Sequence, residues 1–375
     1  MTEDDSSSTH PPLPPTTEDD RFARLRLLRS RRVGPATYRR LLAEHGNARA
    51  ALAALPDIAI ASGDSKYTIC PEGVVHGELK AARAAKARLV FEGEAGFPPL
   101  LSQIDDAPVM LWMVGTQAVL SRPLIALVGA RNASSLGLRM ARKLASELGE
   151  AGFGIVSGLA RGIDAAAHDA ALATGTVAVV AGGVDVVYPA ENAALSQKIG
   201  RDGLRVSDQP LGVSPLAHHF AARNRIISGL CHATIVIEAA AKSGSMITAR
   251  TALDQGRDVL AVPGHPFDAR VAGCNFLIRD GATLVRGARD ILDQVGDPVV
   301  LTQAYAPARP VQPAQPRRSL APDDILFHLS HTPIAEDQLM RSLGAAASAV
   351  APLLMDLELD GKIIRQAGGL LARAV

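Results

Sequence analysis

The residues of this sequence best suited to hold an anion are two arginines that flank an asparagine. Arg223, Asn224 and Arg225 come directly before residues 226–230, whose apolar side chains have helical spacing. We therefore expect both arginines at or before the start of a helix. Guanidinium groups are planar forks that match the oxygens of phosphate, so this segment indicates a phosphate-binding site.

A second pattern of this kind follows a short β-branched run at 234–237, which has the composition of a buried strand. A small polar loop separates that run from a predicted helix at 246–255. Amides at a helix N-terminus carry partial positive charge and lack backbone partners, so the loop is a natural seat for an anion. The candidate residues in and beside this loop are Lys242, Ser243, Gly244, Ser245 and Thr248.

Alternating strand-like and helical runs begin near residue 124 and predict βαβ units with a parallel sheet covered on both faces. Ligands bind such sheets at the carboxyl ends of the strands. The predicted strands are 124–128, 154–156, 176–180, 234–237 and 259–262, and the predicted helices between or after them are 136–151, 163–174, 193–200 and 246–255.

Three further loops with glycine or arginine fall at the same predicted edge of the sheet. The loop 128–134 and the loop 157–164 each follow a strand, contain an arginine and open a helix, while 181–185 is rich in glycine. Together with the Ser243 loop and 262–266, they predict a cleft lined by cations and backbone amides. The candidate residues from the first two loops are Gly129, Arg131, Ser134, Ser157, Gly158, Arg161 and Gly162.

Length and composition limit which class of protein this can be. The chain has 375 residues, a hydrophobic fraction of 47%, a net charge of +1 and only three cysteines. This length predicts two or three domains, and a nucleic-acid site must be a local patch. The distant cysteines and the absence of a membrane-length apolar run favour a cytoplasmic protein with no membrane contact.

The segments before the predicted sheet differ from it in composition. Residues 1–20 are acidic and rich in Pro and Ser, which predicts disorder. Residues 21–88 predict short helices, with a Gly-Pro turn at 33–35 that is typical of a helix-hairpin-helix or simply of a small helical bundle. The arginines crowded into this segment, which make duplex DNA binding plausible, are Arg21, Arg24, Arg26, Arg29, Arg31, Arg32, Arg39 and Arg40.

The C-terminal part begins after a Pro-rich linker predicted at 301–320. Helical runs at 323–329, 335–343 and 345–359, then a hairpin at 363–372, describe a winged helix over 321–375. The third helix contains no Lys or Arg and carries three acidic residues by position 360. We therefore expect this module to bind protein or a second copy of itself rather than a duplex.

Catalysis, metal and cofactor chemistry have weak support in the sequence. Glu238 follows a strand and could act as a general base, but nothing positions Asp185 and Glu191 beside it around a scissile bond. His168 lies among alanines, as packed histidines do. The histidines lack metal-ligand spacing, and neither a dinucleotide fingerprint after a strand nor a P-loop is present. We expect no catalytic residue, no metal and no cofactor.

Six segments together resemble the DNA-processing protein A family (DprA, also called Smf) of bacterial natural transformation. They are VGARNASSLG at 128–137, SGLARGIDAAAH at 157–168, AGGVDVVYPAEN at 181–192, FAARNRIISGL at 220–230, VIEAAAKSGSMITA at 236–249 and VLAVPG at 259–264. The chain departs from the family pattern at Ala221, at Asp208-Gln209 and at Ala190, where many members have lysine. Lys198 on the following helix is the candidate to replace that lysine.

The resemblance implies an α/β fold with a central extended Rossmann-like sheet domain (89–300), an N-terminal helical domain of SAM-like or helix-hairpin-helix type (21–88) and a C-terminal winged helix. It implies binding and protection of single-stranded DNA, loading of the RecA recombinase, and a homodimer without enzymatic turnover. Two alternatives stay open. One is a Rossmann-like hydrolase acting on nucleoside monophosphates with Glu238 as base, and the other is a scaffold that binds partners through the C-terminal module.

Overall fold

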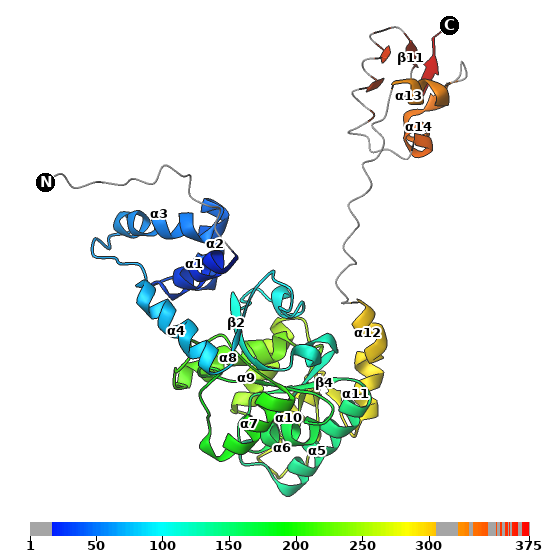
Figure 1. The fold of residues 1–375 in the computed structure, drawn as a ribbon. Coiled ribbons are helices and arrows are strands. Elements are labelled where there is room, and N and C mark those ends of the chain that lie inside the picture. Colours follow the sequence, from blue (N-terminus) through cyan, green and yellow to red (C-terminus); the bar gives the residue numbers. More distant parts are fainter. Residues whose placement is uncertain are drawn as a thin grey trace, which may run out of the picture. The chain divides into compact units, whose positions relative to one another are not determined.

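The protein is described from a computed structural model (Figure 1). The structure describes residues 17–304, 322–329, 333–343, 350, 353–354, 357–358, 360, 362–366 and 370–374. The chain divides into two compact units, residues 1–305 and 306–375, and each is described by itself.

A nine-stranded sheet forms the centre of the first unit, with strand order β1-β2-β6-β5-β4-β3-β7-β8-β9. β1 pairs with β2 and β2 pairs with β6 in antiparallel register, and the other pairs are parallel. The strands are β1 (Arg88–Phe91), β2 (Met110–Gly115), β3 (Leu124–Val128), β4 (Gly154–Ser157), β5 (Thr176–Val179), β6 (Leu204–Ser207), β7 (Ala233–Val236), β8 (Asp258–Ala261) and β9 (Thr283–Leu284).

The order in which the chain lays down its parallel strands creates a topological switch point. From β3 the chain builds β4, β5 and β6 on one side, then returns to place β7 on the other side of β3. The five predicted strands are confirmed to within one residue at each end, whereas β1, β2, β6 and β9 were not predicted. A crevice opens beyond the carboxyl ends of the strands at such a switch point, so the β3–β7 edge is where a ligand is expected.

Helices cover both faces of this sheet because its strands are apolar on both sides. Along β3, Ile125 and Leu127 face one cluster while Leu124, Ala126 and Val128 face the other, as the two-residue period of a strand requires. The first cluster includes α5 (Ser135–Glu150), α6 (Ile163–Ala171) and α11 (Ala288–Val295), and the second includes α8 (Ala217–Gly229), α9 (Gly244–Asp254) and α10 (Ala272–Arg279). The remaining helices of this part are α7 (Ala193–Asp202) and α12 (Pro298–Ala304).

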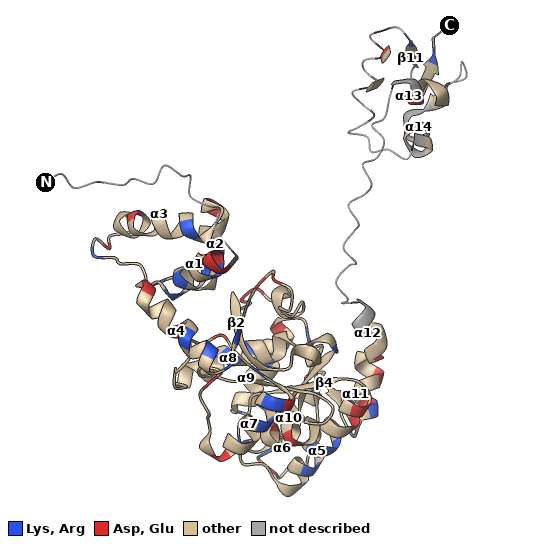
Figure 2. Cartoon of the chain, in the orientation of Figure 1, with Lys and Arg blue, Asp and Glu red and all other residues tan. Residues whose placement is uncertain are grey.

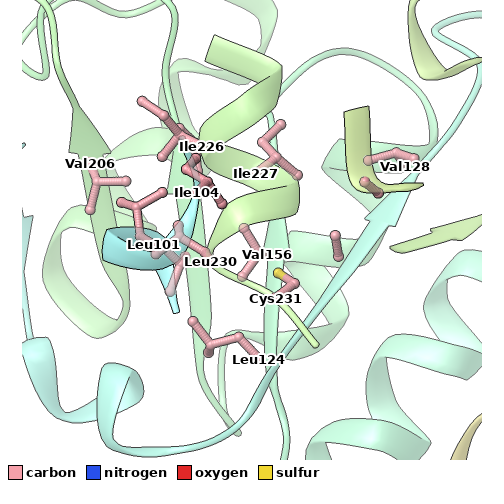
Figure 3. Close-up of a cluster of buried hydrophobic side chains, with 14 of the residues drawn as sticks. Leu101, Ile104, Leu124, Val128, Val156, Val206, Ile226, Ile227, Leu230 and Cys231 are labelled. Atoms are coloured by element: carbon pink, nitrogen blue, oxygen red, sulfur yellow. The ribbon is translucent and has the colours of Figure 1, made fainter. Parts of the chain in front are cut away.

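Helix α8 is longer than the sequence predicted. The C-terminal half of α8 presents Ile226 and Ile227 to the sheet, and Leu230, directly after the helix, joins them beside Val156 and Leu124 in the cluster of buried side chains drawn in Figure 3. Because α8 begins at Ala217, the expectation that Arg223 and Arg225 lie at or before a helix start is wrong. Both arginines instead project from the middle of a helix that the apolar cluster holds against the sheet.

The N-terminal helices pack on the antiparallel end of the sheet. Their buried residues form one cluster with Phe91, Met110 and Trp112 of β1 and β2. Since the first helix begins at Thr17, the prediction of disorder through residue 20 is wrong for 17–20. The helices are α1 (Thr17–Arg29), α2 (Pro35–His45), α3 (Ala48–Ala61) and α4 (Glu72–Ala84).

The arginines of this N-terminal segment are engaged by acids. Figure 2 shows basic and acidic residues interspersed along these helices. Most of the partners come from far along the chain, so adjacency in sequence did not reveal them. The ion pairs are Arg21 and Arg24 with Glu94, Arg26 with Glu72, Arg29 with Glu78, Arg31 and Arg32 with Asp64, Arg39 with Glu92, and Arg40 with Glu44.

The second unit has the elements of a winged helix around its own apolar cluster. Its three-stranded sheet has the order β10-β12-β11, and β11 and β12 form the predicted hairpin. The expected acidic third helix and the Gly-Gly turn at 368–369 lie largely outside the described residues, as does the predicted linker beyond residue 304. The elements are α13 (Pro322–His328), β10 (Ile334–Ala335), α14 (Glu336–Leu343), β11 (Ile363–Gln366) and β12 (Leu370–Arg373).

In the part of the chain that the structure describes, no helix has both the length and the apolarity that crossing a membrane would take. Cys70, Cys231 and Cys274 are all buried free thiols.

We predict that two arginines of the N-terminal segment differ sharply in their effect on stability. Arg29 donates two hydrogen bonds to Glu78, which is buried and also accepts one from the indole of Trp112. Arg29→Ala leaves that carboxylate unpaired and should lower the free energy of unfolding by about 3 kcal/mol. Arg40→Ala is the matched control, because its pair with Glu44 is exposed and should contribute under about 0.5 kcal/mol. Equal losses in urea unfolding would contradict this reading.

Candidate nucleic-acid interface

A cavity of about 590 Å³ opens at the switch point between β3 and β7. Its walls come from the loop after β3, the N-terminal half of α8, the start of α9 and the loop that precedes α10. Of the candidate residues predicted from the sequence, those that line it are Gly129, Arg131, Arg223, Asn224, Ser243, Gly244, Ser245 and Thr248. Segments more than 100 residues apart in the chain thus meet at one sheet edge, as the predicted strand ends required.

Arg131 is an exposed cation at the rim of this cavity. Its guanidinium lies 5.3 Å from the centroid of the Phe220 ring, and Phe220 in turn lies 5.5 Å from Tyr188, measured between ring centroids. A ring face attracts a cation without neutralising its charge. Among the described residues no carboxylate forms an ion pair with Arg131, so its full charge is available to a ligand. Phe220 and Tyr188 were missed as site residues, although each stands in a segment that the sequence analysis quoted.

Arg223 has a structural role in the cavity wall. Its side chain is buried, and one terminal nitrogen donates to the carbonyl of Gly158 at 2.7 Å and to the carbonyl of Val179. Burial lowers the pKa of Arg223 to about 10, an effect that the nearby Asp164 carboxylate opposes, so the group stays charged at neutral pH. A Cβ at Gly158 would lie 2.6 Å from the guanidinium, so only glycine fits there. Arg223 therefore ties the ends of β4 and β5 together beneath the ligand space.

The loop after β4 uses its amides internally. Asp164 is buried and accepts hydrogen bonds from the amides of Gly158 at 3.1 Å and Ala160 at 3.3 Å. The expected role of the Gly158 amide as a phosphate donor is therefore not met. Ser157 is likewise engaged, because its fully buried hydroxyl donates to the carbonyl of Leu127.

The N-terminus of α5 is also occupied, in this case by an acidic side chain of the protein itself. Glu238, which is only 2% exposed, accepts hydrogen bonds from the amide and the hydroxyl of Ser134 and thereby fills the anion seat of that helix. Gly137 makes room for this carboxylate, because a Cβ there would lie 2.0 Å from it. Ser134 thus does not face the cavity. Glu238 is absent from the cavity lining too, which removes the geometric support for it as a general base.

Among the described residues, no acid occupies the start of α9 in this way. Ser243 precedes the helix without capping it through its side chain, and its hydroxyl is buried with no hydrogen-bond partner among the described residues. The amides of Gly244 and Ser245 belong to the first turn, where intrahelical partners are lacking. A hydrogen bond of 2.8 Å from the Ser245 hydroxyl to the carbonyl of Gly129 fixes this turn beside the loop after β3. The anion seat predicted for this loop therefore opens into the cavity.

The other predicted cations lie outside the cavity lining. Arg225 is turned away, in ion pairs with Asp208 at 2.8 Å and Asp106 at 3.7 Å. Arg161 pairs with Glu191 at 3.3 Å and lines a small adjoining hollow together with Gly158, Arg131 and Phe220. The last three candidates are Gly162, in a groove shared with Arg131, and Lys242 and Lys198, which are exposed. Within the described ranges, no three His, Cys, Asp or Glu side chains gather as a metal site would.

Comparison with known proteins gives matches along the whole architecture. A family model described as DNA recombination-mediator protein A matches residues 88–296, a DprA-like N-terminal HHH domain matches 18–81, and a DprA winged helix domain matches 307–369. The DNA processing protein DprA of Streptococcus pneumoniae is 48% identical over 198 residues, which is 52% of this chain and 70% of that protein. Protein Smf of Escherichia coli is 36% identical over 280 residues, covering 73% of this chain and 74% of its own length.

Two solved structures are similar in fold. The X-ray structure of DprA from Streptococcus pneumoniae has a TM-score of 0.56 and 42% identity, and the match covers 60% of this chain and 78% of that one. A structure concerning the single-stranded DNA binding mode of DNA processing protein A from Helicobacter pylori has a TM-score of 0.51 and 28% identity, with 58% of this chain and 98% of that one covered.

We predict an acid-dependent loss of stability that originates beneath the cavity. His168 is fully buried, with its Nδ1 2.7 Å from the hydroxyl of Thr176. Burial, with a further contribution from the charge of Arg223, lowers the pKa of His168 from 6.5 to about 3. Between those values the unfolded chain binds a proton that the folded chain does not, so this group removes about 1.4 kcal/mol of stability per pH unit as the pH falls.

The measurement is urea unfolding between pH 7 and pH 4. His168→Gln should reduce the acid slope relative to the unmodified chain, whereas His265→Gln, at an exposed loop position, should leave it unchanged. A slope that His168→Gln does not alter would show that the imidazole is not held neutral.

Proposed function

Because this chain belongs to the DNA recombination-mediator protein A family, we propose that its cavity binds the sugar-phosphate chain of single-stranded DNA and protects it. The observation that carries this proposal is the pairing of an uncompensated cation, Arg131, with the open N-terminus of α9 around one cavity. Cations and unpartnered amides are the groups that bind phosphate oxygens. The Helicobacter pylori relative, which has been studied for its single-stranded DNA binding mode, supports the same ligand.

The proposed binding is independent of base sequence. Phe220 lines the cavity under Arg131, and Tyr188 packs against Phe220 in the small adjoining hollow. Any base can stack on an aromatic ring, and a ring does not read the hydrogen-bonding edge of the base. Aromatic residues make up only 3% of the chain, but Phe220 lies in the cavity wall and Tyr188 lies beside it in the adjoining hollow.

No observation favours the alternative of a nucleoside monophosphate hydrolase. Its proposed base, Glu238, is buried and bound to Ser134, and it does not line the cavity. Duplex binding through the N-terminal arginines also gains little support, because most of them are largely buried in their ion pairs; the side chains of Arg21, Arg24, Arg26, Arg29 and Arg39 are at most 34% exposed. The proposed ligand is therefore a single strand held at the β3–β7 edge.

We extend the proposal to loading of RecA onto the bound strand and to a homodimer acting in the cytoplasm, as the family resemblance implies. Light scattering of the purified chain tests the dimer, and a mass equal to one chain at micromolar concentration would count against it. RecA filament assembly on single strands covered by a competing binding protein tests loading, and the proposal requires faster assembly when this chain is added.

We predict that Arg131→Ala weakens binding of oligo-dT and lowers the slope of log affinity against log salt by about 0.7, because one phosphate contact is lost from a single strand. Arg286→Ala is the matched control, since Arg286 is an exposed arginine that is absent from the cavity lining. Fluorescence anisotropy at several salt concentrations gives both quantities. If Arg131→Ala and Arg286→Ala behave alike, the strand binds elsewhere.

A further inference from the structure

A third arginine lines the same cavity and was not among the residues predicted from the sequence. Arg270 lies in the loop between β8 and α10 and contributes to the wall together with Arg131 and Arg223. Its side chain is 51% exposed, so it is accessible to a ligand, unlike the buried Arg223. No segment that carries the family resemblance includes this position.

Two carboxylates of different character hold Arg270. Asp268 forms a two-pronged pair with it, through Nε to Oδ1 at 3.0 Å and a terminal nitrogen to Oδ2 at 2.8 Å. Glu238 lies 3.6 Å from Nε. Glu238 also accepts hydrogen bonds from Ser134, so it remains bonded if Arg270 moves.

The pair with Asp268 is exchangeable. The guanidinium is half exposed, so water and salt weaken its attraction to the carboxylate, and Asp268 keeps a hydrogen bond from the backbone amide of Arg270 if the side chains part. A phosphate group offers the same two-oxygen geometry as the aspartate, with at least as much negative charge. A strand that enters the cavity can therefore replace Asp268 as the partner of the guanidinium at low cost.

We propose that Arg270 is a phosphate-binding residue of the cavity and that Asp268 is its built-in competitor, which the DNA backbone displaces. This inference rests on the proposed single-stranded DNA function and adds to it a residue and a regulating acid. The two arginines of the rim then differ in their resting state. Arg131 rests on an aromatic ring and is free of acids among the described residues, whereas Arg270 must exchange one anion for another.

A direct contact is distinguishable from an indirect one. Arg270 could also act only by offsetting the charge of Glu238, which would otherwise repel phosphate. In that case Arg270→Ala would have no effect once Glu238→Gln has removed the charge. A direct contact predicts that the loss persists in the Glu238→Gln background.

The experiment measures oligo-dT affinity of the full chain against salt, with thermal unfolding of each variant as the check on folding. Arg270→Ala should weaken binding roughly tenfold and lower the log–log salt slope by about 0.7. Asp268→Asn should strengthen binding roughly threefold, because the competing charge is gone. The pair Arg286 and Asp290 has the same two-pronged geometry but lies outside the cavity lining, so Arg286→Ala and Asp290→Asn should change neither quantity.

The outcomes separate this inference from the function on which it rests. If Arg131→Ala weakens binding but Arg270→Ala does not, Arg270 is no binding residue and the proposed function stands. If neither does, the cavity is not the DNA site. If Asp268→Asn weakens binding, Asp268 is not a competitor. If the effect of Arg270→Ala vanishes in the Glu238→Gln background, Arg270 makes no direct contact with the strand.

Discussion

The site depends on one buried charge, the guanidinium of Arg223. It projects from the middle of α8 and bonds to backbone carbonyls at the ends of β4 and β5, with the buried Asp164 nearby. A buried arginine is tolerated only when its donors are satisfied, so these contacts also fix where α8 crosses the sheet. Ile226 and Ile227 of the same helix also hold α8 in place, because they are buried against the sheet. The cavity lies above this junction and takes its shape from it.

Arginine has at least three distinct roles in this chain, and its environment decides which. Arg29 and Arg225 pair with acids and join segments that are distant in sequence. Arg223 is buried and bonds to the backbone. Arg131 rests on an aromatic ring, which leaves its charge uncompensated. A chain with a net charge of +1 can thus keep a cationic site, because many of its arginines pair with acids whereas Arg131, among the described residues, does not.

The sequence was sufficient for the parallel sheet and for the edge at which the site lies. Short β-branched runs such as 234–237 strongly indicate buried strands, and neighbouring parallel strands end at the same edge of a sheet. The sequence did not show in which direction each side chain points. Arg223 and Arg225 look equivalent in sequence, but a separation of two residues on a helix turns them to different sides, one into the cavity wall and one toward Asp208.

Residues whose role depends on a distant partner were missed for the same reason. Phe220 matters because Arg131 lies over it, and Arg270 because the loop after β8 closes on the β3 edge. Gly158 is a different case, because it was assigned to phosphate from its type and position although its amide is bonded to Asp164, only six residues further on. The antiparallel strands β1 and β2 were missed because neither alternates apolar and polar residues, which is the usual sign of a half-buried strand, and helical segments precede them.

The two helix N-termini at this edge are unequal, since Glu238 fills the end of α5 while the end of α9 stays open. A nucleic-acid strand has a direction, with its sugars all pointing one way. Such a strand meets different neighbours when it is laid across an asymmetric edge in one sense or in the other. In the proposed complex the open start of α9 can bind an anion, whereas the start of α5 is already filled by Glu238, so a bound strand would have unlike neighbours along this edge.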